Sequence, residues 1–263
     1  MRPPIRLPIG AHQDAIARRV LAEESQQRHH LVITLTGAHA YGFPSPDSDL
    51  DLKGVHLAPT RALLGFHRGP DHASRLETIE GVEIDYASNE LGQVLGGIVK
   101  GIGSFYERIL GMWPVQESPE LAELRPLVVR SVSRRVHAHY RGFATSQYRD
   151  AQQSPTPTAK NVLYVLRTAL TGAHLLASAT LCTDLEEVAG YYGFEHVREL
   201  LAIKREGERT PLPAEVAQRW LVEAERAMAL LDRSMERSSL PDDPPNVAEL
   251  EEYLIARRRE HFD

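Results

Sequence analysis

The hydrophobic and polar positions of this chain show mainly the pattern of β-strands up to about residue 86 and mainly the spacing of helices after it. Residues 31–35 are a continuous, β-branched apolar run, whereas residues 49–57 and 82–86 alternate apolar with polar side chains. These patterns predict one buried strand and two half-buried strands, with a Pro-, Gly- and His-rich loop between the last two. A helix is expected around residues 15–27. From residue 89 onwards the pattern is mostly helical, so the fold class predicted is α+β.

The change of period predicts two unlike domains, with a boundary near residues 117–126. The first, over residues 1–118, is a small unit with a mixed sheet, and the second, over residues 119–263, is helical. Within the second we expect a helix from about Pro126 to Arg149, because proline suits the first turn of a helix. An apolar stripe at helical spacing supports this helix. It consists of Val129, Val132, Val136, Tyr140 and Phe143.

Composition narrows the functional classes. The 263 residues carry 30 Lys and Arg against 36 Asp and Glu, so the net charge of −6 supplies no global attraction for a polyanion. The single cysteine, Cys182, excludes an intramolecular disulfide and leaves a Cys-based zinc cage incomplete. The N-terminal residues contain no apolar run typical of a secretory signal, and Arg167 and His174 interrupt the longest apolar stretch. We therefore expect a cytoplasmic protein with no membrane role.

The strongest chemical feature is the pair Asp49 and Asp51 at the start of a predicted strand. Residues two apart in a strand point to the same side, so the two carboxylates converge while Leu50 and Leu52 face the core. Paired carboxylates suit a hard divalent cation such as Mg²⁺, whose other ligands are water and substrate phosphates. The alternative is that these acids only serve the preceding turn.

Two further features favour the metal site. Gly37 follows a buried strand, where a residue without Cβ lets backbone N–H groups approach an anion closely. Asp85 lies on another predicted strand, opposite its apolar set, and is expected on the sheet face of Asp49 and Asp51. Glu83 has the same facing, so spacing alone does not choose between Glu83 and Asp85.

This ordered set, TGAHAYGFPSPDSDLDLKGV followed by VEIDY, resembles the polymerase-β-type nucleotidyltransferase superfamily. More narrowly, it is similar to the predicted nucleotidyltransferases associated with bacterial RNA-repair operons. The stretch over residues 85–110, the segment YRGFATSQYR and residues 160–167 are also similar to later blocks of that family. The resemblance covers most of the chain up to about residue 180. It implies a mixed-sheet nucleotidyltransferase domain followed by a helical domain.

The resemblance also implies roles for the acids. Asp49 and Asp51 would bind two catalytic ions, Mg²⁺ or Mn²⁺, while Asp85 would share one ion and help to deprotonate the attacking hydroxyl. Two such ions stabilise the attacking and leaving oxygens of a displacement at phosphorus. The expected reaction transfers NMP from an NTP to a hydroxyl, with release of pyrophosphate. The acceptor expected for this family is an RNA end, in RNA repair or end modification, and the family pattern favours Asp85 over Glu83.

One departure concerns the triphosphate. The superfamily has a Gly-Ser turn, whereas this chain has Gly37 and Ala38, so a serine hydroxyl is missing. The backbone N–H groups of Ala38 and His39 remain as donors for a phosphate. Weakened triphosphate binding is the alternative, and the side chain of Thr36 or His39 is a candidate replacement for the hydroxyl.

Further cations are expected to bind the triphosphate. Lys160 and Arg167 belong to a polar stripe at helical spacing, and their place in the resemblance implies that they close over the nucleotide. The alternative is an ordinary amphipathic helix with a solvated face.

A candidate RNA surface lies on the predicted helix that starts near Pro126. Arg130, Arg134 and Arg141 share one helical face with His137, and residues 124–149 contain six Arg and no Asp or Glu. Such a basic segment in an acidic chain suggests a surface for RNA phosphates. Salt bridges to acids of the C-terminal region, for example Glu249, would explain the same residues.

Two other functions remain open at this point. The first is NMP transfer to a small molecule or a protein, which predicts that the arginines are salt-bridged and do not bind RNA. The second is a catalytically degenerate nucleotide- or RNA-binding module, suggested by Ala38.

Overall fold

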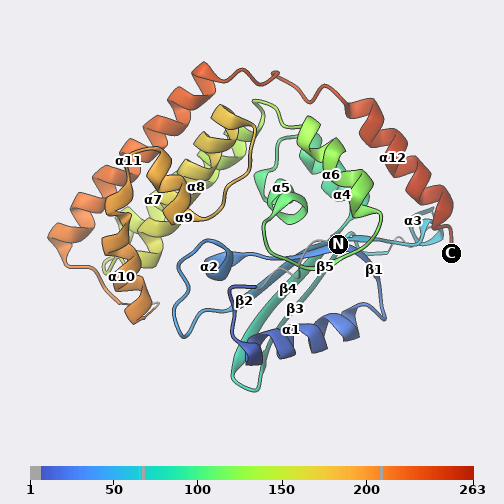
Figure 1. Cartoon of the computed structure of the whole chain (residues 1–263), viewed down its shortest axis with the longest axis horizontal. Coiled ribbons are helices and arrows are strands. Elements are labelled where there is room, and N and C mark those ends of the chain that lie inside the picture. Colours follow the sequence, from blue (N-terminus) through green and yellow to red (C-terminus); the bar gives the residue numbers. More distant parts are fainter. Residues whose placement is uncertain (1–6, 65, 67–68, 208–209) are drawn as a thin grey trace.

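The computed structural model describes residues 7–64, 66, 69–207 and 210–263. The described chain builds one five-stranded sheet with helices on both of its faces and a larger helical region beside it (Figure 1). The strands are β1 (His29–Leu35), β2 (Leu50–Leu57), β3 (His72–Ile79), β4 (Val82–Glu90) and β5 (Pro114–Glu117). The helices are α1 (Ala11–Glu24), α2 (Gly37–Ala40), α3 (Thr60–Leu64), α4 (Leu91–Val99), α5 (Gly103–Leu110), α6 (Leu121–Arg130), α7 (Val136–Gln153), α8 (Ala159–Ser178), α9 (Leu185–Tyr191), the 3₁₀ turn η1 (Glu195–Val197), α10 (Arg198–Glu206), α11 (Ala214–Arg237) and α12 (Val247–Glu260).

The sheet is mixed, in the order β3-β4-β2-β1-β5. Its centre is the parallel pair β2 and β4, and the other neighbours are antiparallel. Parallel strands require a crossover, which here contains α3 and the edge strand β3. This sheet and the helical majority confirm the predicted α+β class.

Alternation along the strands separates the two faces of the sheet. Leu50, Leu52 and Ile33 are completely buried beneath α1, in a cluster that includes Val20 and Leu21. Val32 and Val55 point the other way, into a second cluster built with α4, α5 and α6. Figure 1 shows α1 on one side of the sheet and α4 to α6 on the other. The second cluster also includes residues of α8, α11 and α12, so it joins the sheet to the helical region.

The three predicted strands all form, with small differences at their ends, and β4 continues to Glu90. The prediction of a loop between the half-buried strands was wrong, because β3 lies there. This edge strand is largely solvent-exposed, and Leu76 is 73% exposed, so its sequence lacks the apolar signal of a buried strand. The four-residue β5 was also missed, since so short a strand has no measurable periodicity.

The prediction of a single helix from Pro126 to Arg149 was also wrong. Helix α6 ends at Arg130, and α7 begins at Val136 after a turn. Ser131 closes α6, with its hydroxyl donating to the Val128 carbonyl at 2.7 Å. The turn buries Val132 and continues the apolar spacing across the break, which explains why the sequence looked like one helix. Pro126 lies inside α6 rather than at its first position.

The helical region is centred on α8, which packs between α7 and α11. A capping box starts α8: the Thr158 hydroxyl accepts from the Asn161 N–H, and the Asn161 side chain accepts from the Thr158 N–H. Most of this helix is buried, including Arg167 and Thr171, so the predicted polar stripe is not a solvated face. None of the described helices has the combination of length and apolar character required to cross a membrane.

Candidate active site

Asp51 and Asp85 lie side by side at the centre of the sheet. They are direct partners in the parallel register of β2 and β4. Their neighbours Leu50 and Ile84 are buried on the opposite face, so strand alternation turns both carboxylates towards α5 and the helical region. Their side chains are 22% and 41% exposed. The structure thus brings together Asp51 and Asp85, two members of the predicted acidic triad from different strands, which we call the acidic pair.

Lys53 balances the acidic pair. Its ammonium nitrogen lies 2.6 Å from Asp85 Oδ1 and 3.7 Å from Asp51 Oδ1, and it also donates to the Asp85 carbonyl at 3.1 Å. Lys53 was not predicted from the sequence. The signal was present, because Lys53 follows Asp51 by two positions on the same strand and therefore shares its face.

The surroundings of Asp51 destabilise the negative charge of its carboxylate. Its pKa is raised from 3.8 to about 6, mainly by burial. The negative charges of Asp85 and Asp49 contribute to the rise, while Lys53 and Lys160 oppose it. A group in this state gains most from a divalent cation, which compensates both the lost hydration and the like charge.

Asp49 is the residue immediately before β2 and is partly exposed. Its charge reaches Asp51, as the pKa of Asp51 indicates. Among the described residues, however, the oxygens of Asp49, Asp51 and Asp85 do not all lie within 4.8 Å of one another. Lys53 interacts with both members of the acidic pair, and Asp49 precedes them on the chain, directly before the start of β2.

Gly37 makes room for Asp51. Its φ of +66° is a conformation that favours glycine, and a Cβ at this position would lie 1.8 Å from Asp51 Oδ2. The Thr36 N–H donates to the Asp51 carbonyl at 2.9 Å, which ties the glycine turn to β2. The predicted reason for this glycine was the approach of an anionic ligand, whereas the structure shows that a carboxylate of the chain itself already occupies the space.

A cavity of about 280 Å³ opens beside the acidic pair, between the sheet, α5, α7 and α8. Asp51 and Lys53 form its charged end, and aromatic side chains form much of the remaining wall. These are Tyr41, His139, Tyr140, Phe143 and Tyr164. A charged end beside aromatic walls has the chemistry needed for a nucleotide, because phosphates interact with ions and bases stack on rings.

Arg167 lines this cavity but is already paired. It donates to Glu107 Oε1 at 2.8 Å, and its guanidinium carbon lies 4.0 Å from the centre of the Tyr41 ring. The hydroxyls of Tyr41 and Tyr140 each donate to Glu107 at 3.2 Å. We call Glu107 and Arg167 the buried ion pair, since both are more than nine-tenths buried. Glu107 was not predicted, because its partner lies 60 positions away in the sequence.

Two other cations lie near the cavity. Lys160, in the first turn of α8, has its ammonium 5.9 Å from the Tyr164 ring centre, and its charge lowers the pKa of Asp51. Arg108 lines the cavity and donates to the Gly54 carbonyl at 3.0 Å. Burial lowers the pKa of Arg108 to about 10, so it stays protonated at neutral pH. Arg108 was not predicted, and its sequence neighbours give no signal for it.

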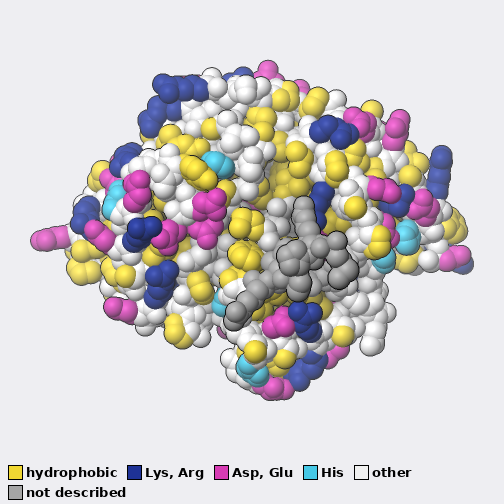
Figure 2. All heavy atoms as spheres, viewed as in Figure 1, with side chains coloured by type: hydrophobic (Ala, Val, Ile, Leu, Met, Phe, Trp, Pro, Cys, Tyr) yellow, Lys and Arg dark blue, Asp and Glu magenta, His cyan; other side chains and the backbone are white. Residues whose placement is uncertain are grey.

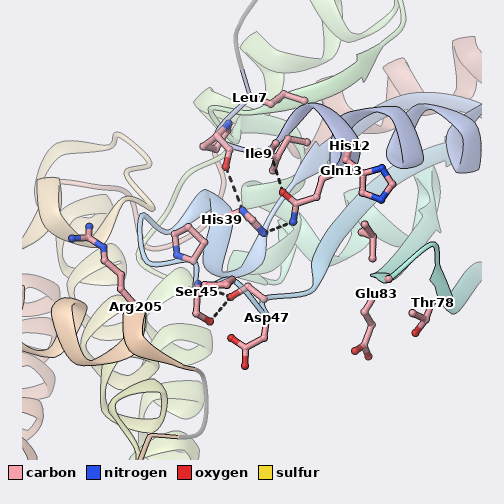
Figure 3. A pocket seen from close by; sticks show the side chains of 17 residues that line it. Leu7, Ile9, His12, Gln13, His39, Ser45, Asp47, Thr78, Glu83 and Arg205 are labelled. Carbon is pink, nitrogen blue, oxygen red and sulfur yellow. Dashed lines mark hydrogen bonds between the residues drawn. The ribbon is translucent and has the colours of Figure 1, made fainter.

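The turn residues Ala38 and His39 are both buried within α2. The His39 ring lies in a second cavity, of about 1020 Å³, where it interacts with the Pro8 carbonyl at 3.3 Å and the Gln13 side chain at 3.4 Å (Figure 3). Burial lowers its pKa. Thr36, by contrast, lines the cavity of the acidic pair. Of the two candidate replacements for the missing serine hydroxyl, only Thr36 therefore lines this cavity.

Glu83 also lines the second cavity and is exposed (Figure 3). It alternates with Asp85 as expected but lies beyond the end of β2, whose pairing with β4 begins at Ile84. The register therefore distinguishes the two acids that spacing alone left equivalent.

The arginines of the predicted RNA surface do not share one helical face, because α6 ends at Arg130 and Arg134 lies in the following turn. Each has an acidic partner: Arg130 pairs with Glu249, Arg134 with Asp242 at 3.0 Å, and Arg141 with Asp232 at 3.0 Å. Figure 2 shows basic and acidic side chains interspersed on the visible face of the helical region. This geometry supports the salt-bridge alternative.

Comparison with known proteins identifies a family and finds similar solved structures. The sequence matches the family model described as "RNA repair pathway DNA polymerase beta family" (RlaP) over residues 13–256. No curated protein matches it. A solved structure titled as a nucleotidyltransferase-like protein from Exiguobacterium sibiricum 255-15 is 12% identical, with 94% of this chain and 80% of that chain covered and a TM-score of 0.33.

Proposed function

The chain belongs to the RNA repair pathway DNA polymerase beta family, a family of the nucleotidyltransferase type, and from this membership we propose a specific reaction. The protein transfers NMP from an NTP to a hydroxyl acceptor, releases pyrophosphate and depends on Mg²⁺ or Mn²⁺. The acceptor is an RNA end. The observation that carries this proposal is the pairing of Asp51 with Asp85 on adjacent parallel strands, with Asp51 at the charged end of a cavity that has aromatic walls.

The residues present fit a divalent cation. The acidic pair places two carboxylates with Asp49 next to them, and the raised pKa of Asp51 means that its charge is poorly compensated by Lys53 alone. Asp49, Asp51 and Asp85 would hold the metal. Bound divalent ions stabilise the attacking and leaving oxygens of an in-line displacement at phosphorus.

The other groups have positioning roles in this proposal. Lys53 keeps the carboxylates together before metal binding and then becomes available to the triphosphate. Lys160, whose charge reaches Asp51, contributes a second cation, and the backbone N–H groups of Ala38 and His39 are proposed phosphate donors. Asp85, the more exposed acid of the pair, accepts the proton of the attacking hydroxyl. Arg167 acts mainly through Glu107, by holding the cavity wall.

The RNA acceptor is supported by the repair context of the family. A second candidate, transfer to a small molecule or a protein, is favoured by one specific observation. Arg130, Arg134 and Arg141 form ion pairs with acidic residues of the chain, and these pairs compete with RNA phosphates for the arginines.

The test is a transfer assay with Mg²⁺ or Mn²⁺, each labelled NTP and a pool of small RNAs. We expect label on RNA, and a loss of about 1,000-fold or more in Asp51→Asn, because metal stabilisation is worth several kcal/mol. Glu83→Gln, on the neighbouring strand β4, is the control and should retain transfer.

Each result of this assay separates the candidates. Label only on protein or on a small acceptor would replace RNA with the second candidate. Nucleotide binding without any transfer would support a degenerate binding module. Full activity in Asp51→Asn would contradict the assignment of the acidic pair.

A further inference from the structure

A second cluster of metal-ligating side chains lies away from the acidic pair, where three distant segments meet. His29 starts β1, Glu120 directly precedes α6, and His261 follows α12. Figure 1 shows the end of α12 returning to the region of β1 and α3. We propose that these three residues bind a transition-metal ion, with Zn²⁺ as the best match, and that the ion fastens α12 to the sheet.

The distances are close to those of a coordinated ion. His29 Nε2 lies 3.0 Å from Glu120 Oε1, and His261 Nε2 lies 3.9 Å from the same oxygen. One ligand atom from each residue falls within 4.8 Å of the other two. Ligands at about 2.0–2.1 Å from a tetrahedral Zn²⁺ are roughly 3.3 Å apart. The imidazole rings of His29 and His261 stack with their centres 5.0 Å apart and 29° between their planes, so binding requires a contraction and a rotation of the rings towards the ion.

Glu120 is the central residue of the cluster. Its Oε1 is the atom nearest to both imidazoles, and its side chain is only 17% exposed. The Ser118 side chain and the Glu120 backbone N–H interact with the same carboxylate, which fixes its position. The two imidazoles are more open, with exposed fractions of 42% for His29 and 34% for His261. Both line a cavity of about 310 Å³ through which an ion and water can enter.

The donor set distinguishes this cluster from the acidic pair. Two imidazole nitrogens and one carboxylate oxygen suit Zn²⁺, whereas Mg²⁺ takes oxygen ligands almost alone. Three protein ligands leave the fourth tetrahedral position to water. The two sites should therefore select different metals when both are present.

The surrounding contacts explain what the ion would stabilise. The Thr60 N–H donates to the His261 carbonyl at 2.8 Å, and the Thr60 hydroxyl donates to the Arg258 carbonyl at 2.6 Å. The end of α12 thus already lies against the start of α3. An ion shared with His29 and Glu120 adds a link to β1 and α6, which are separated from α12 by more than a hundred positions in the sequence.

The test is a Zn²⁺ titration of the metal-stripped full chain by calorimetry, with excess Mg²⁺ present to occupy oxygen-ligand sites. We expect one equivalent of Zn²⁺ to bind and the thermal unfolding midpoint to rise. His261→Ala and His29→Ala should each weaken binding by about 100-fold or more, because losing a ligand costs at least as much as losing its supporting contacts. His12→Ala, an exposed histidine elsewhere, is the matched control and should leave binding unchanged.

A second measurement keeps the test valid if a variant folds poorly. X-ray absorption of the Zn²⁺-loaded wild-type chain should show two imidazole ligands, and an oxygen-only shell would overturn the proposal. So would the absence of Zn²⁺ binding, or full affinity in folded His261→Ala. Asp51→Asn should retain Zn²⁺ binding, which makes the result independent of nucleotidyl transfer.

Discussion

The acidic pair and the buried ion pair border the same cavity but balance their charges in opposite ways. Asp51 and Asp85 carry the same charge and share one counter-charge, Lys53. Glu107 and Arg167 neutralise each other, and two tyrosine hydroxyls complete the hydrogen bonds of the carboxylate. The charges of the first cluster are only partly compensated, while those of the second neutralise each other, although the buried Arg167 Nε has no hydrogen-bond partner among the described residues.

This difference indicates different roles for the two clusters: the acidic pair suits chemistry, and the buried ion pair supports the structure around it. Like charges kept together destabilise the folded chain unless a cation joins them, so such an arrangement is retained where function requires it. A hydrogen-bonded ion pair of opposite sign instead joins α5 to α8 and sets the shape of the cavity wall. Breaking each cluster should therefore have different consequences.

The largest effect is expected from Gly37→Ala, which displaces the acidic pair without removing a charge. The added Cβ would lie 1.8 Å from Asp51 Oδ2, and the φ of +66° would cost the new residue roughly 1–2 kcal/mol. We expect transfer to fall by about 1,000-fold, as for loss of the metal ligands. The control is Gly96→Ala, whose Cβ would meet nothing within 4 Å. Equal activity in the two variants would contradict the spatial role of Gly37.

The next effect concerns the buried ion pair. Glu107→Gln or Arg167→Met leaves an uncompensated charge or an unfilled partner, and each should lower the free energy of unfolding by about 3–5 kcal/mol. The double variant should lose much less than the sum, which urea unfolding of all four proteins measures. Strict additivity would show that the two side chains do not stabilise each other.

A smaller and opposite effect is expected for Asp51→Asn. The folded pKa of Asp51, about 6, lies above the unfolded value of 3.8, so the folded state binds more protons between these values and wild-type stability falls as the pH rises through this window. The variant should therefore be more stable than the wild type by about 1–3 kcal/mol at pH 7, with the gain disappearing towards pH 4. Urea unfolding at several pH values measures this, and Glu83→Gln is the control. A variant less stable than the wild type at pH 7 would be inconsistent with an uncompensated charge.

The smallest effect is expected at the arginines of the helical region. Arg134→Ala and Arg141→Ala remove partly exposed ion pairs, so each should lower the free energy of unfolding by only about 0.2–1 kcal/mol. We expect RNA affinity, measured at several salt concentrations, to stay unchanged relative to Arg18→Ala. A marked loss of affinity with a shallower salt dependence would restore the predicted RNA surface.

The parts of the fold and site that the sequence predicted depend on local alternation. Strand period placed Leu50 and Leu52 in the core and Asp51 on the opposite face, and the same rule placed Asp85. The edge strand β3 was not predicted, because most of its side chains are exposed to solvent and its sequence lacks the apolar alternation of a buried strand. The break between α6 and α7 was not predicted, because the turn continues the spacing of apolar residues that is typical of a helix.

The charged contacts were much harder to predict. Arg167 was identified as a cation of the site, but its carboxylate lies on α5, and only the packing of α5 against α8 brings them within 2.8 Å. Arg134 and Arg141 likewise acquire their partners from the C-terminal half of the chain. Whether such residues are paired depends on distances between segments that are far apart in the sequence, and a local sequence pattern does not report these distances.

The sequence by itself determined the α+β class and placed Asp51 and Asp85 on one face of the sheet, because side-chain direction in a strand follows from chain geometry alone. The reason for the glycine at position 37, the space taken by the Asp51 carboxylate, appeared only in the tertiary structure. The tertiary structure decided which charges are compensated: Lys53 for the acidic pair, Glu107 for Arg167, and the acids facing the arginines. Electrostatic energy depends on separation in space and on burial, and both arise only when distant segments pack.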